Sequence, residues 1–301
     1  MKIAILMSSY NGENYIEEQI ESILAQQCDC AIDLHVRDDG STDKTKQILQ
    51  RYADAGKLRW YTGENLKPAR SFIDLVTACP GYDYYAFADQ DDYWYPDKLQ
   101  SCISRLADKT GPAMAFSNAK LVDGQRNPLG RNVYKKTPNC DFYSVLCGGG
   151  ILGCTIAFNE QLAALLREYN KPEKLIMHDS YLAILCTLFD GQISYDPAPS
   201  MDYRQHGNNV VGTQWNKWDA LKNRIGRITG RQKVSIADMA QSILDQKPRI
   251  VNGDKHAFLE RVATYRTSFW KAARLACSRK PRYNSKNMEI TMRLAILLRN
   301  R

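Results

Sequence analysis

Short apolar, β-prone runs alternate with segments of helical period along the first half of this 301-residue chain. The run Lys2–Met7 leads into a small polar turn, Ser8–Gly12, and apolar residues then recur at helical spacing to about Gln27. The same pattern predicts strands at 2–7, 32–36, 58–61, 84–88 and 113–117, and helices at 15–27, 43–55, 68–78 and 96–106. Strands that alternate with helices of this length predict an α/β fold, in which a mostly parallel sheet is covered by helices on both faces.

The alternation loosens after about residue 124. We expect further strands at 152–158, 193–195 and 201–204, and helices after Asn159 and at 178–188. Beyond Gly212 only helical segments are expected, at 215–228, 236–244, 256–277 and 288–298. The sequence therefore predicts two domains, an α/β domain over residues 1–212 and a helical C-terminal region over residues 213–301.

The charge of the chain divides at the same point. Residues 1–212 carry 21 Lys+Arg and 27 Asp+Glu, a net −6, whereas residues 213–301 carry 20 and 6, a net +14; together these give the total of +8. Aromatic side chains lie among the basic residues of the tail, at Trp215, Trp218, Tyr265, Phe269, Trp270 and Tyr283. A basic amphipathic region suits the surface of an anionic bilayer. We favour this interpretation over helices that are structural or form a homo-oligomer, and over a nucleic-acid partner.

No membrane span or export signal is expected. The mean hydropathy is −0.46, and the longest uncharged stretch, 142–159, contains four glycines, so it lacks the apolar character of a bilayer span. The N-terminus has no small-residue cleavage site. The nine cysteines include no C-x-x-C spacing, which favours free thiols in a reducing compartment. We therefore expect a cytoplasmic protein, peripheral on the inner face of the plasma membrane.

Three carboxylates stand within four residues directly after the predicted strand 84–88, at Asp89, Asp91 and Asp92. Carboxylates this close repel one another, so a cation is expected among them, and hard oxygen ligands favour Mg²⁺ or Mn²⁺. Such an ion would also bridge phosphates. The alternative is a solvated acidic turn that caps the helix starting at Pro96.

Two more polar turns follow predicted strands. Asp38 and Asp39 precede Gly40, and as ionised carboxylates they accept hydrogen bonds from a base N–H or from ribose hydroxyls. The turn that contains Ser9 and Tyr10 offers backbone N–H groups and a ring that can stack on the same base. Because ligands of parallel α/β sheets bind beyond the carboxyl ends of the strands, we expect all three turns to line one site.

In these motifs the chain resembles the family 2 glycosyltransferases of the GT-A fold. S-Y-N-G follows the first predicted strand, D-D-G-S-T-D the second, and D-Q-D-D with W-x-P-D-K-L the strand at 84–88. H-D-S-Y at 178–181 and Y-R-Q-H-G-N-N at 203–209 continue the resemblance, which covers roughly residues 1–212. Each motif alone is weak evidence for the resemblance, but five motifs in this order are strong evidence.

The resemblance implies a nucleotide diphosphate-sugar site. It assigns the donor nucleotide, UDP or dTDP, to Ser9, Tyr10, Asn11, Asp38, Asp39, Asp89 and Arg204. It assigns the Mn²⁺ or Mg²⁺ that bridges the diphosphate to Asp91, Asp92 and His206. Which of the three motif carboxylates first touches the ion stays open, and His206 has the alternative of an ordinary loop hydrogen bond.

The resemblance also implies a general base, Asp179, where the family usually carries Glu-Asp; here His178 replaces the Glu. The alternative for Asp179 is a helix N-cap. Donor sugar or acceptor contacts are assigned to Trp94, Gly148, Gly149 and His178. The alternatives are a core position for Trp94 and a tight turn for the glycines.

The family inverts the anomeric centre in one displacement, so one base suffices. The sequence thus predicts a metal-dependent inverting transferase that moves a hexose or deoxyhexose, rhamnose-like, to a hydroxyl of a glycan or lipid-linked acceptor in bacterial surface polysaccharide synthesis. Two alternatives are a sugar nucleotidyltransferase and an inactive nucleotide-sugar-binding scaffold. The first should carry a Gly-rich, Arg-containing loop after the first strand, which S-S-Y-N-G-E-N-Y lacks.

Overall fold

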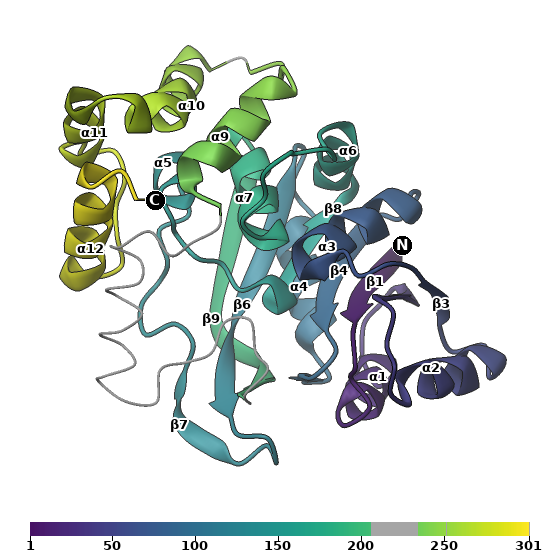
Figure 1. Cartoon of the computed structure of the whole chain (residues 1–301). Helices are drawn as coiled ribbons and strands as arrows, with labels where there is room; N and C mark the ends of the chain where they lie inside the picture. Colours follow the sequence, from purple (N-terminus) through teal and green to yellow (C-terminus); the bar gives the residue numbers. More distant parts are fainter. Residues whose placement is uncertain (206–233, 251, 301) are drawn as a thin grey trace. The chain divides into compact units, whose positions relative to one another are not determined.

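The structure is a computed structural model that describes residues 1–205, 234–250 and 252–300 (Figure 1). Its strands are β1 (Lys2–Ser9), β2 (Ala31–Asp38), β3 (Arg59–Thr62), β4 (Tyr84–Asp89), β5 (Tyr93–Trp94), β6 (Ala113–Val122), β7 (Pro128–Asn132), β8 (Ile156–Asn159) and β9 (Gln192–Arg204). Its α-helices are α1 (Ile16–Leu24), α2 (Thr45–Asp54), α3 (Lys67–Ala78), α4 (Lys98–Leu106), α5 (Phe142–Leu146), α6 (Glu160–Glu168), α7 (His178–Leu188), α9 (Ile236–Asp245), α10 (Gly253–Thr264), α11 (Phe269–Ala276) and α12 (Lys286–Leu297). Two 3₁₀-helices are η1 (Gly153–Thr155) and η2 (Tyr265–Thr267).

One sheet joins all the described strands, in the order β3-β2-β1-β4-β8-β6-β9-β5, with β7 paired to β6. Four pairs of strands are parallel: β1 with β2, β1 with β4, β2 with β3, and β6 with β9. The short strands β5, β7 and β8 add antiparallel pairs. The predicted α/β fold with a mostly parallel sheet is confirmed.

Strand β1 shows why helices cover both faces of the sheet. Its odd-numbered residues, Ile3, Ile5 and Met7, belong to a buried core that they share with residues of α1, α2 and α4. Its even-numbered residues, Ala4 and Leu6, are equally buried and point to the opposite face, because successive strand residues alternate. Helices α3 and α6 contact each other and the sheet strands. A strand without a solvated face therefore reads as a continuous apolar run, as the sequence does.

The described residues form two compact units, 1–135 with 152–170 and 190–205, and 136–151 with 171–189, 234–250 and 252–300. The first unit holds the whole sheet with α1–α4 and α6, and the second holds α5, α7 and α9–α12. The domain boundary predicted at residue 212 lies outside the described residues and stays a prediction.

The described part of the C-terminal region, 234–250 and 252–300, is helical, as predicted, but one expected helix there is wrong. The helix predicted at 215–228 lies outside the described residues. The segment 256–277 is divided into α10, η2 and α11, because Ser268 is extended and its hydroxyl accepts a hydrogen bond from Trp270 N–H, which starts a new helix. The strands expected at 193–195 and 201–204 form the single strand β9, and β7 was not predicted. Among the described residues, no helix is both long and apolar enough to span a bilayer.

Candidate active site

The register of the sheet brings the three polar turns to one edge. Strand β1 lies between β2 and β4 and is parallel to both. The register pairs Ser9 with Asp38 and Ser8 with Asp89. The first, second and third turns, which follow β1, β2 and β4, therefore lie side by side at the carboxyl ends of the strands, as predicted.

The side chain of Gln90 holds the third turn to the first. Its Oε1 accepts a hydrogen bond from Tyr10 N–H (2.9 Å) and its Nε2 donates to Tyr10 O (3.0 Å). A Cβ on Gly12 would lie 2.3 Å from Gln90 Oε1, so a larger residue at this position would displace the Gln90 amide. The Asn11 side chain accepts a hydrogen bond from Thr42 N–H (2.9 Å), which ties the first turn to the second. The Tyr10 ring remains 49% exposed and is open to stacking.

The two carboxylates of the second turn make different contacts. Asp38 closes its own turn, because Oδ2 accepts from Ser41 N–H (2.9 Å) and Oδ1 from the buried Ser9 hydroxyl (3.3 Å). Asp39 donates its N–H to Ser9 O (2.8 Å), and its Oδ1 pairs with the buried guanidinium of Arg37. Asp39 is 3% exposed, and its Oδ2 accepts no hydrogen bond from the residues of the described ranges. Asp39 therefore keeps one acceptor atom for a ligand, whereas the Asp38 carboxylate serves the loop.

The third turn gathers potential metal ligands. Asp89, Asp92 and Cys154 each bring one ligand atom within 4.8 Å of the others. Asp89 and Asp91 are half-buried and Asp92 is fully buried. Burial, and secondarily the neighbouring Asp91 and Asp89 carboxylates, raises the pKa of Asp92 well above its usual value. A cation would relieve this cost, and carboxylate oxygens suit Mg²⁺ or Mn²⁺, so these residues fit a divalent ion.

Arg204 holds the acidic turn in place. It is 3% exposed, its Nε donates to Asp91 O (2.7 Å), its Nη1 donates to Gly124 O (2.6 Å), and its Nη2 pairs with Glu18. Its backbone N–H donates to Asp92 Oδ1 (3.2 Å). These contacts give Arg204 a positioning role, and its contact with the diphosphate stays a prediction. The predicted metal ligand His206 lies outside the described residues.

Asp179 and His178 belong to the second unit, at the start of α7. The N-cap is Met177, so Asp179 is the second helical residue and not the cap. Asp179 is 9% exposed and its Oδ1 accepts from Ser180 N–H (2.5 Å), at a helix end whose dipole favours an anion. Burial lowers the pKa of His178 to about 3, so this imidazole is neutral at physiological pH. Of the two side chains, only that of Asp179 carries a carboxylate that can accept a proton from an acceptor hydroxyl.

The remaining predicted contacts lie in structural positions. The Trp94 ring is 1% exposed and packs in the core, with Lys98 Nζ 4.7 Å from its centroid, which leaves no face of the indole open to an acceptor. Gly148 has φ +103°, the left-handed region that glycine favours. A Cβ on Gly149 would lie 3.0 Å from Ser144 O. Both glycines are thus explained by a tight turn, and their contact with a sugar stays a prediction.

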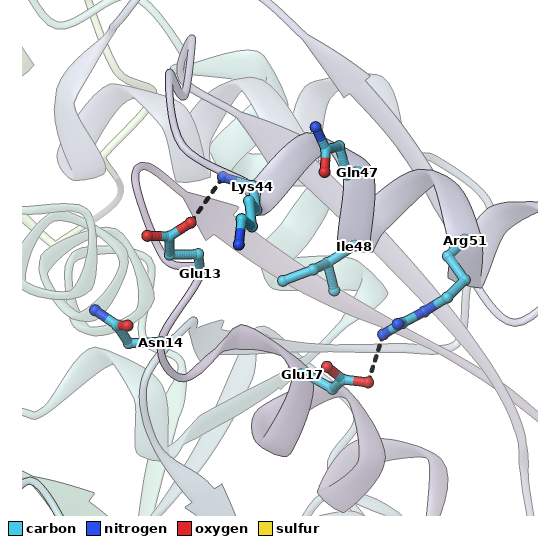
Figure 2. Close-up of a pocket in the computed structure, with 7 residues that line it drawn as sticks. All are labelled: Glu13, Asn14, Glu17, Lys44, Gln47, Ile48 and Arg51. Carbon is cyan, nitrogen blue, oxygen red and sulfur yellow. Dashed lines mark hydrogen bonds and ion pairs between the residues drawn. The ribbon is translucent and has the colours of Figure 1, made fainter.

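A cavity of about 450 Å³ lies between the residues that lead into α1 and one side of α2 (Figure 2). It is lined by Glu13, Asn14, Glu17, Lys44, Gln47, Ile48 and Arg51. Glu17 pairs with Arg51, and Glu13 accepts a hydrogen bond from Lys44 N–H (3.0 Å), as Figure 2 shows. None of the predicted site residues lines this cavity, and we assign it no role.

Comparison with known proteins shows to which family the chain, and with it this sheet edge, belongs. The model of the family described as "Glycosyl transferase family 2" matches residues 4–159, which include all three turns. The chain belongs to this family. It is therefore a glycosyltransferase, as the sequence predicts. The dTDP-rhamnosyl transferase RfbG of Shigella flexneri is 27% identical over 288 residues, which cover 89% of this chain and 94% of that protein.

Other relatives in the family show a similar level of identity. The UDP-Glc:alpha-D-GlcNAc-diphosphoundecaprenol beta-1,3-glucosyltransferase WfgD of Escherichia coli is 27% identical over 192 residues, covering 64% of this chain and 72% of that protein. Among solved structures, Staphylococcus aureus TarS (residues 1–349) in complex with UDP aligns with a TM-score of 0.54 at 18% identity, covering 87% of this chain and 69% of that one. The likeness to TarS shows a shared fold and supports the GT-A assignment.

Sequence reasoning missed three residues that shape this family 2 site: Arg37, Gln90 and Cys154. Arg37 lies at the end of a predicted buried strand, and a buried guanidinium needs an anionic partner. The motif V-R-D-D could therefore have predicted an ion pair between Arg37 and a neighbouring aspartate. The role of Gln90 depends on its reach to Tyr10, 80 positions away, which no local pattern encodes. Cys154 likewise joins the acidic turn only through the fold.

Proposed function

We propose that the protein is a metal-dependent inverting glycosyltransferase that moves a hexose or deoxyhexose from a UDP- or dTDP-sugar to a hydroxyl of a glycan or lipid-linked acceptor, in bacterial surface polysaccharide synthesis. The observation that carries the proposal is the register that puts Asp39 and Asp89 at one sheet edge within a family 2 chain. RfbG is named as a dTDP-rhamnosyl transferase, and WfgD as a glucosyltransferase that acts on a diphosphoundecaprenol-linked sugar. These names support the donor and acceptor classes that we propose for this protein.

The chemistry follows from the charges of the named groups. The acceptor hydroxyl attacks the anomeric carbon, its proton passes to the Asp179 carboxylate, and the bond to the nucleoside diphosphate breaks. Asp91, with Asp89 or Asp92, would hold Mn²⁺ or Mg²⁺, which when bound neutralises the charge of the departing diphosphate. No second carboxylic acid is then needed to protonate the leaving oxygen. Arg204 and Gln90 keep the acidic turn and the first turn in position.

Two rival functions make different demands on the site. A sugar nucleotidyltransferase binds a nucleoside triphosphate and needs cationic groups on the first turn, but Ser9, Tyr10 and Asn11 are uncharged and their backbone is tied to other turns. An inactive scaffold does not need a carboxylate at the position of Asp179. Membership of a transferase family and the presence of both Asp91 and Asp179 favour the transferase.

We expect pyrimidine nucleoside diphosphates and their sugars to raise the melting temperature of the full chain in the presence of Mn²⁺. A ligand that binds only the folded state stabilises it by RT ln(1 + [L]/Kd), about 2.7 kcal/mol at a hundredfold excess over Kd. The measurement is a thermal shift panel of UDP, dTDP, GDP and ADP with their common sugars, followed by an assay for sugar transfer or slow donor hydrolysis. Stabilisation by nucleoside triphosphates alone, with pyrophosphate release, would favour the nucleotidyltransferase, and binding without turnover would favour the scaffold.

We also propose that the C-terminal helices bring the enzyme to an anionic membrane surface, where a lipid-linked acceptor lies. Large apolar side chains that are exposed in the described residues concentrate here: five of eight are on α11 or α12 or directly follow α12, at Phe269, Trp270, Ile290, Leu294 and Leu298. Residues 269–300 carry eight Lys+Arg and one Glu. Of the other tail aromatics, Tyr265 is buried in the structure, Tyr283 is half-buried, and Trp215 and Trp218 lie outside the described residues. An exposed aromatic and basic surface suits the headgroup region.

The variants Trp270→Ser and Lys271→Glu are expected to weaken binding to vesicles that contain anionic lipid. A basic residue near such a surface contributes about 1 kcal/mol, so loss of the Lys271 charge alone should lower the partition coefficient roughly fivefold. Flotation with anionic and with zwitterionic vesicles measures this. Lys57→Glu, the same charge change on an exposed lysine of the first unit, is the control and should bind as wild type. Equal flotation of all variants would contradict membrane binding by these helices. Self-association of the wild type that the two tail variants abolish would instead assign the helices to a homo-oligomer interface.

A further inference from the structure

Arg37 is buried in the donor site and makes contacts with several parts of the loop around it. It is 3% exposed on β2, its Nη1 pairs with Asp39 Oδ1, its Nε contacts Asp74 Oδ2 at 3.0 Å, and its Nη2 donates to Glu64 O at 3.1 Å. Tyr61 donates its hydroxyl to the same Asp74 oxygen at 2.7 Å. The guanidinium is thus fixed at three of its nitrogens, and the only buried carboxylate that it touches in the described part of the chain is that of Asp39.

Gly63 provides the space for this guanidinium. A Cβ at residue 63 would lie 2.8 Å from Arg37 Nη2, whereas its backbone is not in the left-handed region that by itself calls for glycine. The absence of a side chain at residue 63 is therefore explained by the guanidinium and not by the turn. Arg37 on β2 and Gly63, which directly follows the neighbouring strand β3, act together to set where Asp39 points.

The pairing leaves Asp39 with a single acceptor atom. Oδ1 is taken by Arg37, and Oδ2 accepts nothing from the residues that the structure describes. A carboxylate paired with arginine is an anion, so it accepts hydrogen bonds and donates none. Oδ2 is not among the fully buried side-chain atoms that lack a partner, so this oxygen is accessible to a donor group of a ligand.

We propose that Arg37 is a positioning residue that restricts the donor nucleotide to a base with one ring N–H, uracil or thymine, by occupying one of the two oxygens of Asp39. This inference rests on the proposed function, since it assumes that the base lies against Asp39. Guanine presents a ring N–H and an adjacent amino group, a pair of donors that needs both carboxylate oxygens. Cytosine and adenine present a ring nitrogen lone pair beside their amino group, which an anionic oxygen repels. The imide N–H of uracil or thymine matches one open oxygen.

The test is the affinity of the full chain for UDP, dTDP and GDP, measured by calorimetry with Mn²⁺ present. We expect wild type to prefer UDP or dTDP over GDP. Arg37→Met should weaken UDP and dTDP binding about 10- to 100-fold, the size expected when a buried partner of a charged group is removed, and should narrow the preference over GDP. Arg37→Lys should retain only part of the affinity for UDP and dTDP, because one ammonium group does not replace the several N–H donors of the guanidinium. In steady-state kinetics, Arg37→Met should raise the KM for the donor more than it lowers kcat.

Arg59→Met is the matched control, because Arg59 lies on the neighbouring strand β3 with a side chain 72% exposed. It should bind as wild type. Where Arg37→Met does not fold, Asp74→Asn carries the test: its side chain is 43% exposed, and loss of its contact with Arg37 should weaken UDP or dTDP binding about threefold. Unchanged affinities for UDP, dTDP and GDP in a folded Arg37→Met protein would overturn the role of Arg37 but not the proposed function. A preference of the wild type for GDP would do the same. A wild-type protein that binds no nucleoside diphosphate would instead overturn the proposed function.

Discussion

Replacing Asp179 with Asn is expected to lower kcat for sugar transfer by ~10²–10⁴-fold while the donor nucleotide binds as before, because a positioned general base contributes a factor of that size. Asn keeps the shape of the side chain and can accept the hydrogen bond from Ser180 N–H, so the start of α7 should remain intact. It cannot take the proton of the acceptor hydroxyl. The measurement pairs a steady-state transfer assay with calorimetry of the donor nucleotide.

A second carboxylate of the same unit provides the control. Asp254 lies on α10 with a side chain 74% exposed and pairs with Lys280, so Asp254→Asn should leave kcat unchanged. Near-normal transfer by Asp179→Asn would remove this residue from the mechanism. Loss of donor binding in the same variant would give it a structural or donor-binding role.

The strand pattern carried most of what could be predicted of the fold. Apolar runs followed by polar turns located both ends of β1, β2 and β4 to within two residues. Parallel pairing then forces the turns at Ser9, Asp38 and Asp89 to one edge, a consequence of topology that requires no side-chain detail. The sheet edge where we propose that the donor binds could therefore be predicted from the sequence once the sheet was predicted to be parallel.

What was not predicted depends on contacts between distant residues. The sequence placed Asp38 and Asp39 together in the nucleotide site, but only the structure shows that Asp38 accepts the hydrogen bonds of its own turn and that Asp39 pairs with Arg37. Trp94 had two interpretations until its 1% exposure was known. The break at Ser268 was missed because apolar residues continue at helical spacing on both sides of it. Burial and hydrogen-bond partners are tertiary properties, so local periodicity carries little information about them.

Asp91→Asn is expected to lower kcat/KM by roughly 10²–10³-fold, because a bound divalent ion contributes several kcal/mol of charge stabilisation when the diphosphate leaves. Asn preserves the size of the half-buried side chain and leaves the backbone carbonyl that Arg204 contacts in place. The fold should therefore survive. The Mn²⁺ affinity of the enzyme with UDP or dTDP, followed by electron paramagnetic resonance, should fall by a similar factor, and excess Mn²⁺ should restore part of the activity. Removal of the ion from wild type with a chelator should match the variant.

The comparison with Asp92→Asn decides which carboxylate of the acidic turn touches the ion. Asp92 is fully buried, accepts from Arg204 N–H (3.2 Å) and has a pKa raised well above its usual value by burial. A neutral amide in its place removes a buried charge and keeps an acceptor, so a purely structural Asp92 predicts a small change in Mn²⁺ affinity and a melting temperature equal to or above that of wild type. If Asp92 is the ligand together with Asp89 and Cys154, its variant loses Mn²⁺ and Asp91→Asn does not. The first outcome assigns the ion to the half-buried Asp91 and explains Asp92 as the acceptor that fixes β9 to the acidic turn.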